Sequence, residues 1–193
     1  IRQRGIDQLS HDNECSASTR VALQDMDEAV RKADGTIRKL LDYSRGTPPN
    51  MKSDDVAIAL NKVLNLLSHE CRQRNIKIET TFADKLPLIR MDDDQIQQLF
   101  MNIVLNAIQS MTEEGVLSVD CSTRRLRQAD LQRDSTGSFR EGDTVVWIEI
   151  NDTGHGIEEQ DLGKLYDPFF TTRPLGEGTG LGLTVSLNIV RTH

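Results

Sequence analysis

Residues 46–50, GTPPN, set the strongest limit on how this chain can fold. Glycine favours the end of a helix, and two consecutive prolines cannot continue one, because they lack the backbone N–H and fix φ. A helix on the N-terminal side must therefore end here, and a new unit must begin beyond it. The sequence predicts two units, residues 1–45 and 52–193, joined by a hinge over residues 46–51.

A heptad pattern runs along the unit before this break. One row of side chains alternates at spacings of three and four, and a second row recurs every seven residues beside it. The first row is Leu23, Met26, Val30, Ala33, Ile37, Leu40 and Ser44, and the second is Ala22, Ala29, Thr36 and Tyr43. A stripe this wide suits a helical bundle better than a two-stranded coiled coil. With a shorter helical segment upstream, it predicts a hairpin that self-associates to cover its apolar stripe.

Helical and strand patterns alternate in the second unit. Helices are predicted over residues 54–74, 94–111, 158–166 and 181–193, and strands over residues 76–82, 116–123 and 144–151. The strands look antiparallel, and a polar loop over residues 124–143 is expected to join the last two. Because the elements alternate without a repeat, the predicted fold is α+β, with the second unit forming an α/β sandwich.

Two of these helices have sides that are expected to be buried. The first is expected to bury Ile58, Val63, Leu66 and Leu67, and the second Ile96, Leu99, Phe100, Ile103, Ala107 and Met111. Asp92 stands three residues before Gln95, as in a capping box, and therefore predicts the start of the second helix.

Charge and cysteine content narrow the setting of the chain. The net charge of −7 argues against nucleic acid or an anionic membrane surface as a partner. Cys15, Cys71 and Cys121 fit no zinc-binding spacing, so we expect free thiols in a reduced cytoplasm. No apolar run approaches the ~18 residues of a membrane span. Because the chain begins with Ile1, we expect it to be part of a longer protein, which is free to carry a membrane anchor.

The segment GEGTGLGL, residues 176–183, places four glycines among eight residues directly before the last predicted helix. The dinucleotide pattern GxGxxG is not completed, because Leu181 or Leu183 occupies its sixth position. The phosphate-binding loop GxxxxGK[ST] is excluded as well, because no lysine follows these glycines. Backbone N–H groups at a glycine-rich helix start nevertheless favour an anion, and a flexible surface loop is the alternative.

Polar groups elsewhere add two candidate contacts. Asn102 and Asn106 stand one turn apart on their helix, and their amide oxygens suit a hard cation that also carries phosphate ligands, although two solvated side chains would look the same. Asp152 ends a strand before Gly154 and Gly156, so it can accept a hydrogen bond from a ligand amine while a flat ring lies against the glycines. An ordinary Asx turn is the alternative there.

Four segments in this order resemble the motifs of the ATP-binding domain of sensor histidine kinases, within the superfamily that includes gyrase, Hsp90 chaperones and MutL. LFMNIVLNAIQSM resembles the N box, DTGHGI the G1 box, DPFFTT the F box and GEGTGLGL the G2 box. LLDYSR, residues 40–45, resembles the end of the dimerisation and phosphotransfer hairpin. The resemblance implies an α/β sandwich with ATP under a lid between the F and G2 boxes, and a homodimer in which each hairpin is half of a four-helix bundle.

The resemblance also implies roles for individual residues. Asp152 would accept the adenine amino group, Asn106 would bind Mg²⁺, and Asn102 would help to place the phosphates. The whole implied ATP-binding set is Asn102, Asn106, Gln109, Asp152, Gly154, Gly156, Ile157, Thr172, Arg173, Gly178, Thr179, Gly180, Leu181 and Gly182. The family often has a lysine shortly after the second asparagine; here Gln109 takes that place, so one charged phosphate contact is expected to be missing.

The hydrolytic members of the superfamily have a glutamate four residues before the metal-binding asparagine, where it activates water. Here that residue is Asn102, and an amide cannot take a proton from water. The resemblance therefore implies a kinase that passes the γ-phosphate of ATP to a histidine and onward to an aspartate of a response-regulator receiver domain. An ATPase of the same superfamily and a non-catalytic nucleotide-sensing module are the alternatives.

None of the four histidines is expected to be the phosphate acceptor. The family's acceptor begins a motif such as HE[IV]xNPL, which neither His11 nor His69 opens; His155 lies between the G1 glycines, where an exposed turn residue is expected, and His193 is terminal. We therefore expect the acceptor histidine upstream of Ile1, no self-labelling by this chain, no certain catalytic side chain within it, and a further strand pair after His193.

Overall fold

The computed structural model describes residues 19, 21–27, 30, 48–131, 137–174 and 178–193. Residue 19 and residues 21–27 are helical, in agreement with the heptad pattern. Residue 30 is helical as well, whereas residues 1–18, 20, 28–29 and 31–45 of the predicted hairpin, the first two residues of the hinge, and Gly176 and Glu177 of the glycine segment lie outside the described residues.

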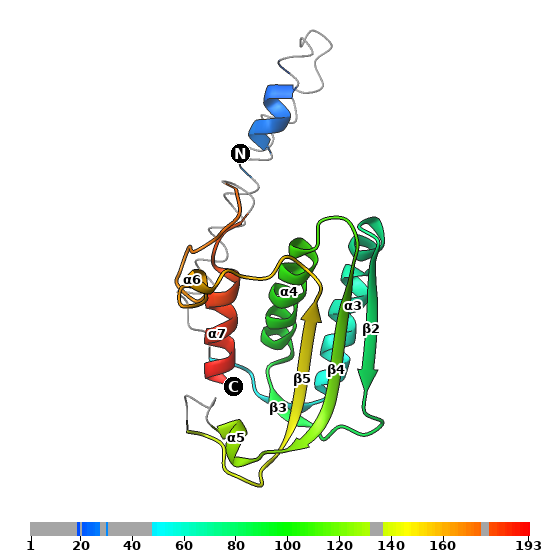
Figure 1. Ribbon diagram of the computed structural model, residues 1–193, viewed down its shortest axis with the longest axis vertical. Helices are drawn as coiled ribbons and strands as arrows, with labels where there is room; N and C mark the ends of the chain where they lie inside the picture. Colours follow the sequence, from blue (N-terminus) through cyan, green and yellow to red (C-terminus); the bar gives the residue numbers. More distant parts are fainter. Residues whose placement is uncertain (1–18, 20, 28–29, 31–47, 132–136, 175–177) are drawn as a thin grey trace.

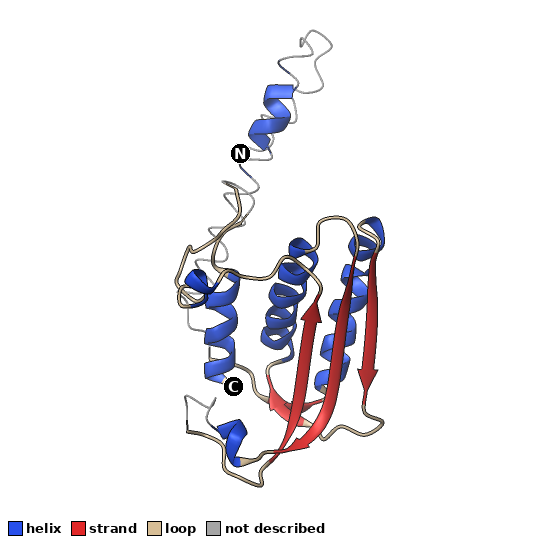
Figure 2. Cartoon of the chain, viewed as in Figure 1, coloured by secondary structure: helices blue, strands red, loops and turns tan. Residues whose placement is uncertain are grey.

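Three long helices and a mixed sheet form the second unit (Figures 1 and 2). In chain order the elements are β1 (Lys52–Asp54), α3 (Val56–Gln73), β2 (Ile76–Phe82), β3 (Ile89–Met91), α4 (Asp93–Ser110), β4 (Gly115–Arg125), α5 (Gln128–Leu131), β5 (Thr144–Asp152), α6 (Glu159–Leu162) and α7 (Gly182–Thr192). α4 lies between α3 and α7, and α3 and α4 also contact the sheet. This arrangement confirms the predicted α+β fold.

The main sheet has the strand order β2-β4-β5. β4 and β5 are antiparallel, with Arg125 opposite Thr144, as the predicted hairpin requires. β2 and β4 are parallel, with Ile76 opposite Gly115, whereas the sequence suggested antiparallel strands. The difference arises because α4 crosses between them and returns the chain to the end where β2 began. The short strands β1 and β3 pair separately and were not predicted, because three residues are too few to show an alternating pattern.

The buried sides of α3 and α4 differ in part from the predicted ones. α3 buries Val56, Ala59, Leu60, Val63, Leu64, Leu67 and Cys71, and α4 buries Ile96, Phe100, Val104, Ala107 and Ile108. Ile58 and Leu66 are instead 52% and 69% exposed, so their predicted burial was wrong. On α4, Val104 and Ile108 are fully buried, while Ile103 is only half-buried. Because α4 packs against two helices and the sheet, its buried side is rotated from Ile103 toward Val104 and Ile108.

The two cysteines in the described part of the chain are free and buried. Burial raises the pKa of both thiols, and that of Cys121 to about 11. Both are therefore neutral and poorly nucleophilic near neutral pH. This agrees with the expected free thiols at Cys71 and Cys121, while Cys15 lies outside the described residues. No described helix has the length and apolar character needed to cross a membrane.

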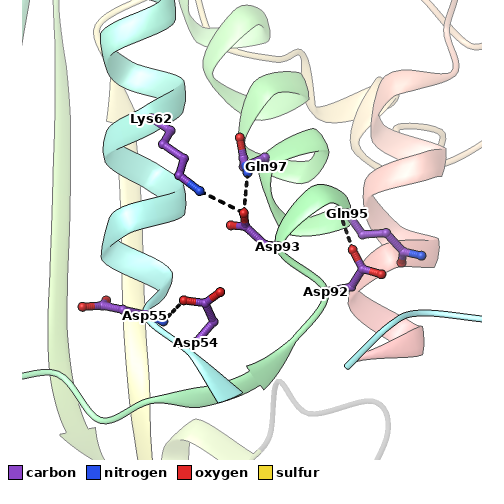
Figure 3. A network of polar contacts seen from close by, with 7 residues as sticks. All are labelled: Asp54, Asp55, Lys62, Asp92, Asp93, Gln95 and Gln97. Carbon is purple, nitrogen blue, oxygen red and sulfur yellow. Dashed lines mark hydrogen bonds and ion pairs between the residues drawn. The ribbon is translucent and has the colours of Figure 1, made fainter. Parts of the chain in front are cut away.

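Carboxylates fix the starts of α3 and α4 (Figure 3). The side chain of Asp55 accepts a hydrogen bond from the Ala57 N–H at 2.9 Å, and Asp92 Oδ1 accepts one from the Gln95 N–H at 3.1 Å. The predicted cap at Asp92 is thus confirmed. An ion pair of 2.9 Å between Lys62 and Asp93 joins the two helices near these starts.

Asp92 also connects segments that are distant in sequence. Its Oδ2 accepts a hydrogen bond from the Asn50 N–H at 2.7 Å, and its own N–H donates to His193 Nε2 at 3.0 Å. The chain entering the second unit, the start of α4 and the end of α7 therefore meet at one residue. Partial burial opposes ionisation of Asp92, but backbone N–H donors, chiefly those of Asn50 and Gln95, hold its pKa below the usual value.

Removing this carboxylate should destabilise the fold. We expect Asp92→Ala to lower the free energy of unfolding by about 1 kcal/mol, a typical loss for a helix cap. Because the pKa of Asp92 is lowered on folding, the stabilisation is present above 3.8 and is lost as pH falls through the folded value. Urea unfolding at pH 7 and pH 3 measures both effects, with Asp94→Ala in the same first turn as the control. Equal losses for the two variants at pH 7 would contradict the assignment.

Candidate nucleotide site

Three element ends converge at one end of the second unit (Figure 1). They are the C-terminal half of α4, the C-terminal end of β5 and the N-terminal end of α7. Every residue of the predicted ATP-binding set lies on these ends or on the segment between β5 and α7. The sheet and helix packing therefore bring together motifs that are up to 80 residues apart, such as Asn102 and Gly182.

Asp152 is held in a fixed orientation at the end of β5. Its Oδ1 accepts hydrogen bonds from Ser110 Oγ and from the Gly154 N–H, each at 2.9 Å. Among the described residues no group donates to Oδ2, and the side chain is exposed. The Asx turn and a ligand contact are therefore compatible, because one oxygen makes the turn and the other is left to accept from an amine.

Gly154 and Gly156, which follow Asp152, are favoured at their positions for different structural reasons. A Cβ at Gly154 would stand 2.0 Å from Ser110 Oγ, so no side chain fits there. Gly156 has φ +72°, which favours glycine, and its neighbourhood is open. His155 and Ile157 are exposed beside it, and Nδ1 of His155 lies 2.8 Å from the carbonyl oxygen of Gly156. His155 thus lies in an exposed turn, as expected.

Ser110 is a part of this site that the sequence interpretation missed. Its Oγ donates to Asp152 Oδ1, and its side chain fills the space that a Cβ at position 154 would need. A signal was present: Asn102, Asn106 and Ser110 recur every four residues and therefore share one side of α4.

Asn102 is tied to the first turn of α7. Its Nδ2 donates to the carbonyl oxygen of Gly182 at 3.1 Å and to Ser186 Oγ at 3.4 Å. Ser186 Oγ in turn donates to the same carbonyl at 2.9 Å. Asn102 is therefore not a solvated surface amide; it fixes the start of α7 against α4.

Asn106 and Gln109 both contact a single guanidinium. Arg173 Nη2 donates to Asn106 Oδ1 at 3.1 Å, and Arg173 Nη1 donates to Gln109 Oε1. The amide oxygen of Asn106 is a hard ligand of the kind that Mg²⁺ accepts when phosphates and water complete its coordination. Asn106 Oδ1 is an oxygen of this kind, and in this structure it accepts from Arg173.

Two hydrogen bonds hold the ends of the segment between α6 and α7 together. The Phe169 N–H donates to the Gly180 carbonyl at 3.0 Å, and Thr184 Oγ1 donates to the Tyr166 carbonyl at 3.1 Å. Gly180 has φ +61°, and a Cβ there would stand 2.3 Å from the Phe169 carbonyl carbon. Phe169 itself has φ +69°, which is unusual for a bulky residue. These contacts hold Tyr166 and Phe169 against Gly180 and Thr184.

The remaining predicted residues lie on this loop or at the start of α7. Thr172 is exposed, Gly178 and Thr179 are half-buried, and Leu181 is buried. Leu181 is the N-cap of α7, and no side chain caps the helix. Among the described residues, no side chain accepts from the first N–H groups of α7, so these groups and the positive end of the helix dipole favour an anion.

Comparisons with known proteins agree with this geometry. Residues 91–193 match the family model described as histidine kinase-, DNA gyrase B-, and HSP90-like ATPase. The chain is 32% identical over 170 residues to the sensor histidine kinase ZraS of Escherichia coli (strain K12), an alignment that covers 88% of this chain and 32% of ZraS. It is 28% identical over 174 residues to the C4-dicarboxylate transport sensor protein DctS of Rhodobacter capsulatus, covering 90% of this chain and 24% of DctS. The chain thus spans about a third or less of these relatives.

A solved structure shares the fold. Full-length ShkA in complex with AMPPNP superposes with a TM-score of 0.69 at 18% identity, covering 98% of this chain and 41% of ShkA. The family match over residues 91–193 and the curated relatives together show that the chain belongs to the histidine kinase-, DNA gyrase B- and HSP90-like ATPase family, with an ATP-binding domain of the sensor histidine kinase type.

Proposed function

We propose that the chain is the ATP-binding catalytic region of a two-component sensor histidine kinase. It transfers the γ-phosphate of ATP to a histidine, from which the phosphate passes to an aspartate of a response-regulator receiver domain. The observation that carries the proposal is the convergence of Asp152, the α4 amides and the uncapped start of α7 at one end of the unit. A relative in fold, the histidine kinase ThkA, is known in complex with the response regulator TrrA, with a TM-score of 0.58 and 17% identity over 90% of this chain and 46% of ThkA.

The adenine end of ATP is assigned to the turn after β5. Ser110 and Gly154 hold Oδ1 of Asp152, so Oδ2 faces outward as an acceptor for the adenine amino group. Gly154 and Gly156 carry no side chain over the turn, and the exposed Ile157 offers an apolar contact to a flat ring. Orientation of the carboxylate by neighbouring donors makes the contact specific for an amine.

The phosphates are assigned to the start of α7. Backbone N–H groups from Gly178 to Gly182 and the helix dipole attract them, Asn102 holds that helix start in place, and Thr172 and Arg173 reach them from the loop. Asn106 would hold Mg²⁺, which supplies neutralisation of phosphate charge when bound. The segment between Phe169 and Gly180 serves as the lid, with its ends joined at the base.

Transfer to a histidine is favoured over hydrolysis by the chemistry of Asn102. An amide is too weak a base to take a proton from water, and the amide nitrogen of Asn102 donates to Gly182 and Ser186. No carboxylate takes the place that a water-activating glutamate would need on α4.

The N-terminal unit is assigned to dimerisation. Val21, Met26 and Val30 are apolar and at least half exposed in a single chain, at 56%, 60% and 51%. A second copy of the hairpin would cover them in a four-helix bundle. Residues 1–45 would then be the dimerisation and phosphotransfer hairpin, residues 46–51 the hinge and residues 52–193 the catalytic domain, working in the cytoplasm.

Loss of the Asp152 carboxylate should weaken recognition of adenine. We expect Asp152→Ala to weaken binding of ATP with Mg²⁺ by at least about tenfold, because a charged hydrogen bond is worth about 1.5 kcal/mol or more. Isothermal titration calorimetry measures the change, and Asp84→Ala, an exposed carboxylate in a loop, is the control. Unchanged affinity in Asp152→Ala would refute the adenine assignment.

The reaction type is tested by following the γ-phosphate. With γ-³²P-labelled ATP and a supplied hairpin that carries an HExxNP motif, we expect acid-labile, alkali-stable label on the hairpin and background release of free phosphate. Steady phosphate release that Asn102→Ala abolishes would instead indicate an ATPase. Nucleotide binding without either outcome would indicate a nucleotide-sensing module.

The base of the lid should not tolerate a side chain at position 180. We expect Gly180→Ala to destabilise the chain by roughly 1–3 kcal/mol, because the added carbon meets the Phe169 backbone and the residue keeps a positive φ. The same change at Gly163, which has φ −68° and no atom within reach of an added Cβ, is the control and should be nearly neutral. Thermal unfolding and chymotrypsin cleavage after Phe170 report the difference; equal behaviour of the two variants would contradict the joined-end lid.

A further inference from the structure

We propose that Gln109 is a positioning residue for Arg173, and that the pair supplies the cation that distinguishes a nucleoside triphosphate from a diphosphate. The inference rests on the proposed function, because it assigns a task within the nucleotide site. It concerns the position where the expected charged contact on α4 is missing.

The pair joins two segments 64 residues apart. Gln109 lies on α4 three residues after Asn106, and Arg173 lies in the lid. The two terminal nitrogens of one guanidinium donate to the two amide oxygens, at 3.1 Å for Asn106. The planar fork of arginine allows both contacts at once, which a lysine ammonium could not reproduce in the same geometry.

The electrostatics of α4 explain why a cation must come from elsewhere. The helix sequence contains neither Lys nor Arg, so its site-facing side offers only neutral amides and a hydroxyl. A triphosphate retains negative charge beside Mg²⁺, and the chain itself has a net charge of −7. Within the described part of the chain, Arg173 is the basic side chain that hydrogen-bonds to the C-terminal half of α4.

The chemistry of Gln109 suits this task. A neutral amide oxygen orients the guanidinium and leaves its charge intact, whereas a glutamate would cancel that charge and a lysine would repel it. The bond from Arg173 to Asn106 plays a different part from the bond to Gln109. Asn106 Oδ1 is the proposed metal ligand and would hold Mg²⁺ in place of Arg173, whereas the bond to Gln109 would keep the guanidinium next to the phosphates. Gln109 thus acts through Arg173 and not by touching the nucleotide.

The test compares ATP with ADP on the full chain. By calorimetry with Mg²⁺ present, we expect Gln109→Ala to weaken ATP binding about tenfold and ADP binding less than about twofold, because only the terminal phosphate loses its charged contact. Gln97→Ala is the matched control, because Gln97 is on the same helix but bonds to Asp93 on the side of α3 (Figure 3). Arg173→Ala should give the same selective loss, and Gln109→Ala should add nothing to it.

Exchanging the charge separates positioning from a structural role. Gln109→Lys alone should weaken ATP binding through repulsion of Arg173, and combining it with Arg173→Gln should restore affinity to within about threefold, since the cation then stands on α4. An unchanged ATP-to-ADP ratio in Gln109→Ala, or fully additive effects with Arg173→Ala, would overturn the pairing while ATP binding by the unmutated chain keeps the proposed function intact. Absence of nucleotide binding by the unmutated chain would overturn both.

Discussion

The rotation of α4 about its own axis determines the whole site. Val104 and Ile108 are fully buried against the neighbouring helices and sheet, which turns Asn102, Asn106 and Ser110 to the side where β5 ends and α7 begins. Each of these polar side chains then orients a different part of the surroundings: a helix start, a lid arginine and a strand-end carboxylate. Burial of one side of a helix therefore sets the polar geometry of the other.

Much of this could be predicted from the sequence because it depends on local patterns. The strand at residues 76–82, the cap at Asp92 and the polar stripe on α4 follow from periodicity and short-range hydrogen bonding. The rotation of α4 could not, because burial at Val104 instead of Ile103 depends on helices on both sides. The bond between Arg173 and Gln109 and the positive φ of Phe169 were equally out of reach, since each depends on a partner far away in sequence.

The segment proposed as the lid has hydrogen-bonded ends. The Phe169 and Gly180 backbones are hydrogen-bonded, and Thr184 holds the chain before them. Fixing the ends reduces the entropy that must be lost when a nucleotide orders the loop, because the loop is already closed. Arg173, within this segment, also contacts α4 through Asn106 and Gln109.

The hydrogen bonds of Asp92 join the segment that enters the second unit to both α4 and α7. The segment at Asn50 meets the start of α4 and the end of α7 there, and both helices run from this point to the opposite end of the unit, where the nucleotide site lies. A helix of 18 residues is about 27 Å long. A tilt of about 2° at its base therefore moves its far end by about 1 Å, a displacement comparable to the tolerance of a hydrogen bond. Small rotations at the point where the chain enters the unit therefore become larger displacements at the far ends of α4 and α7.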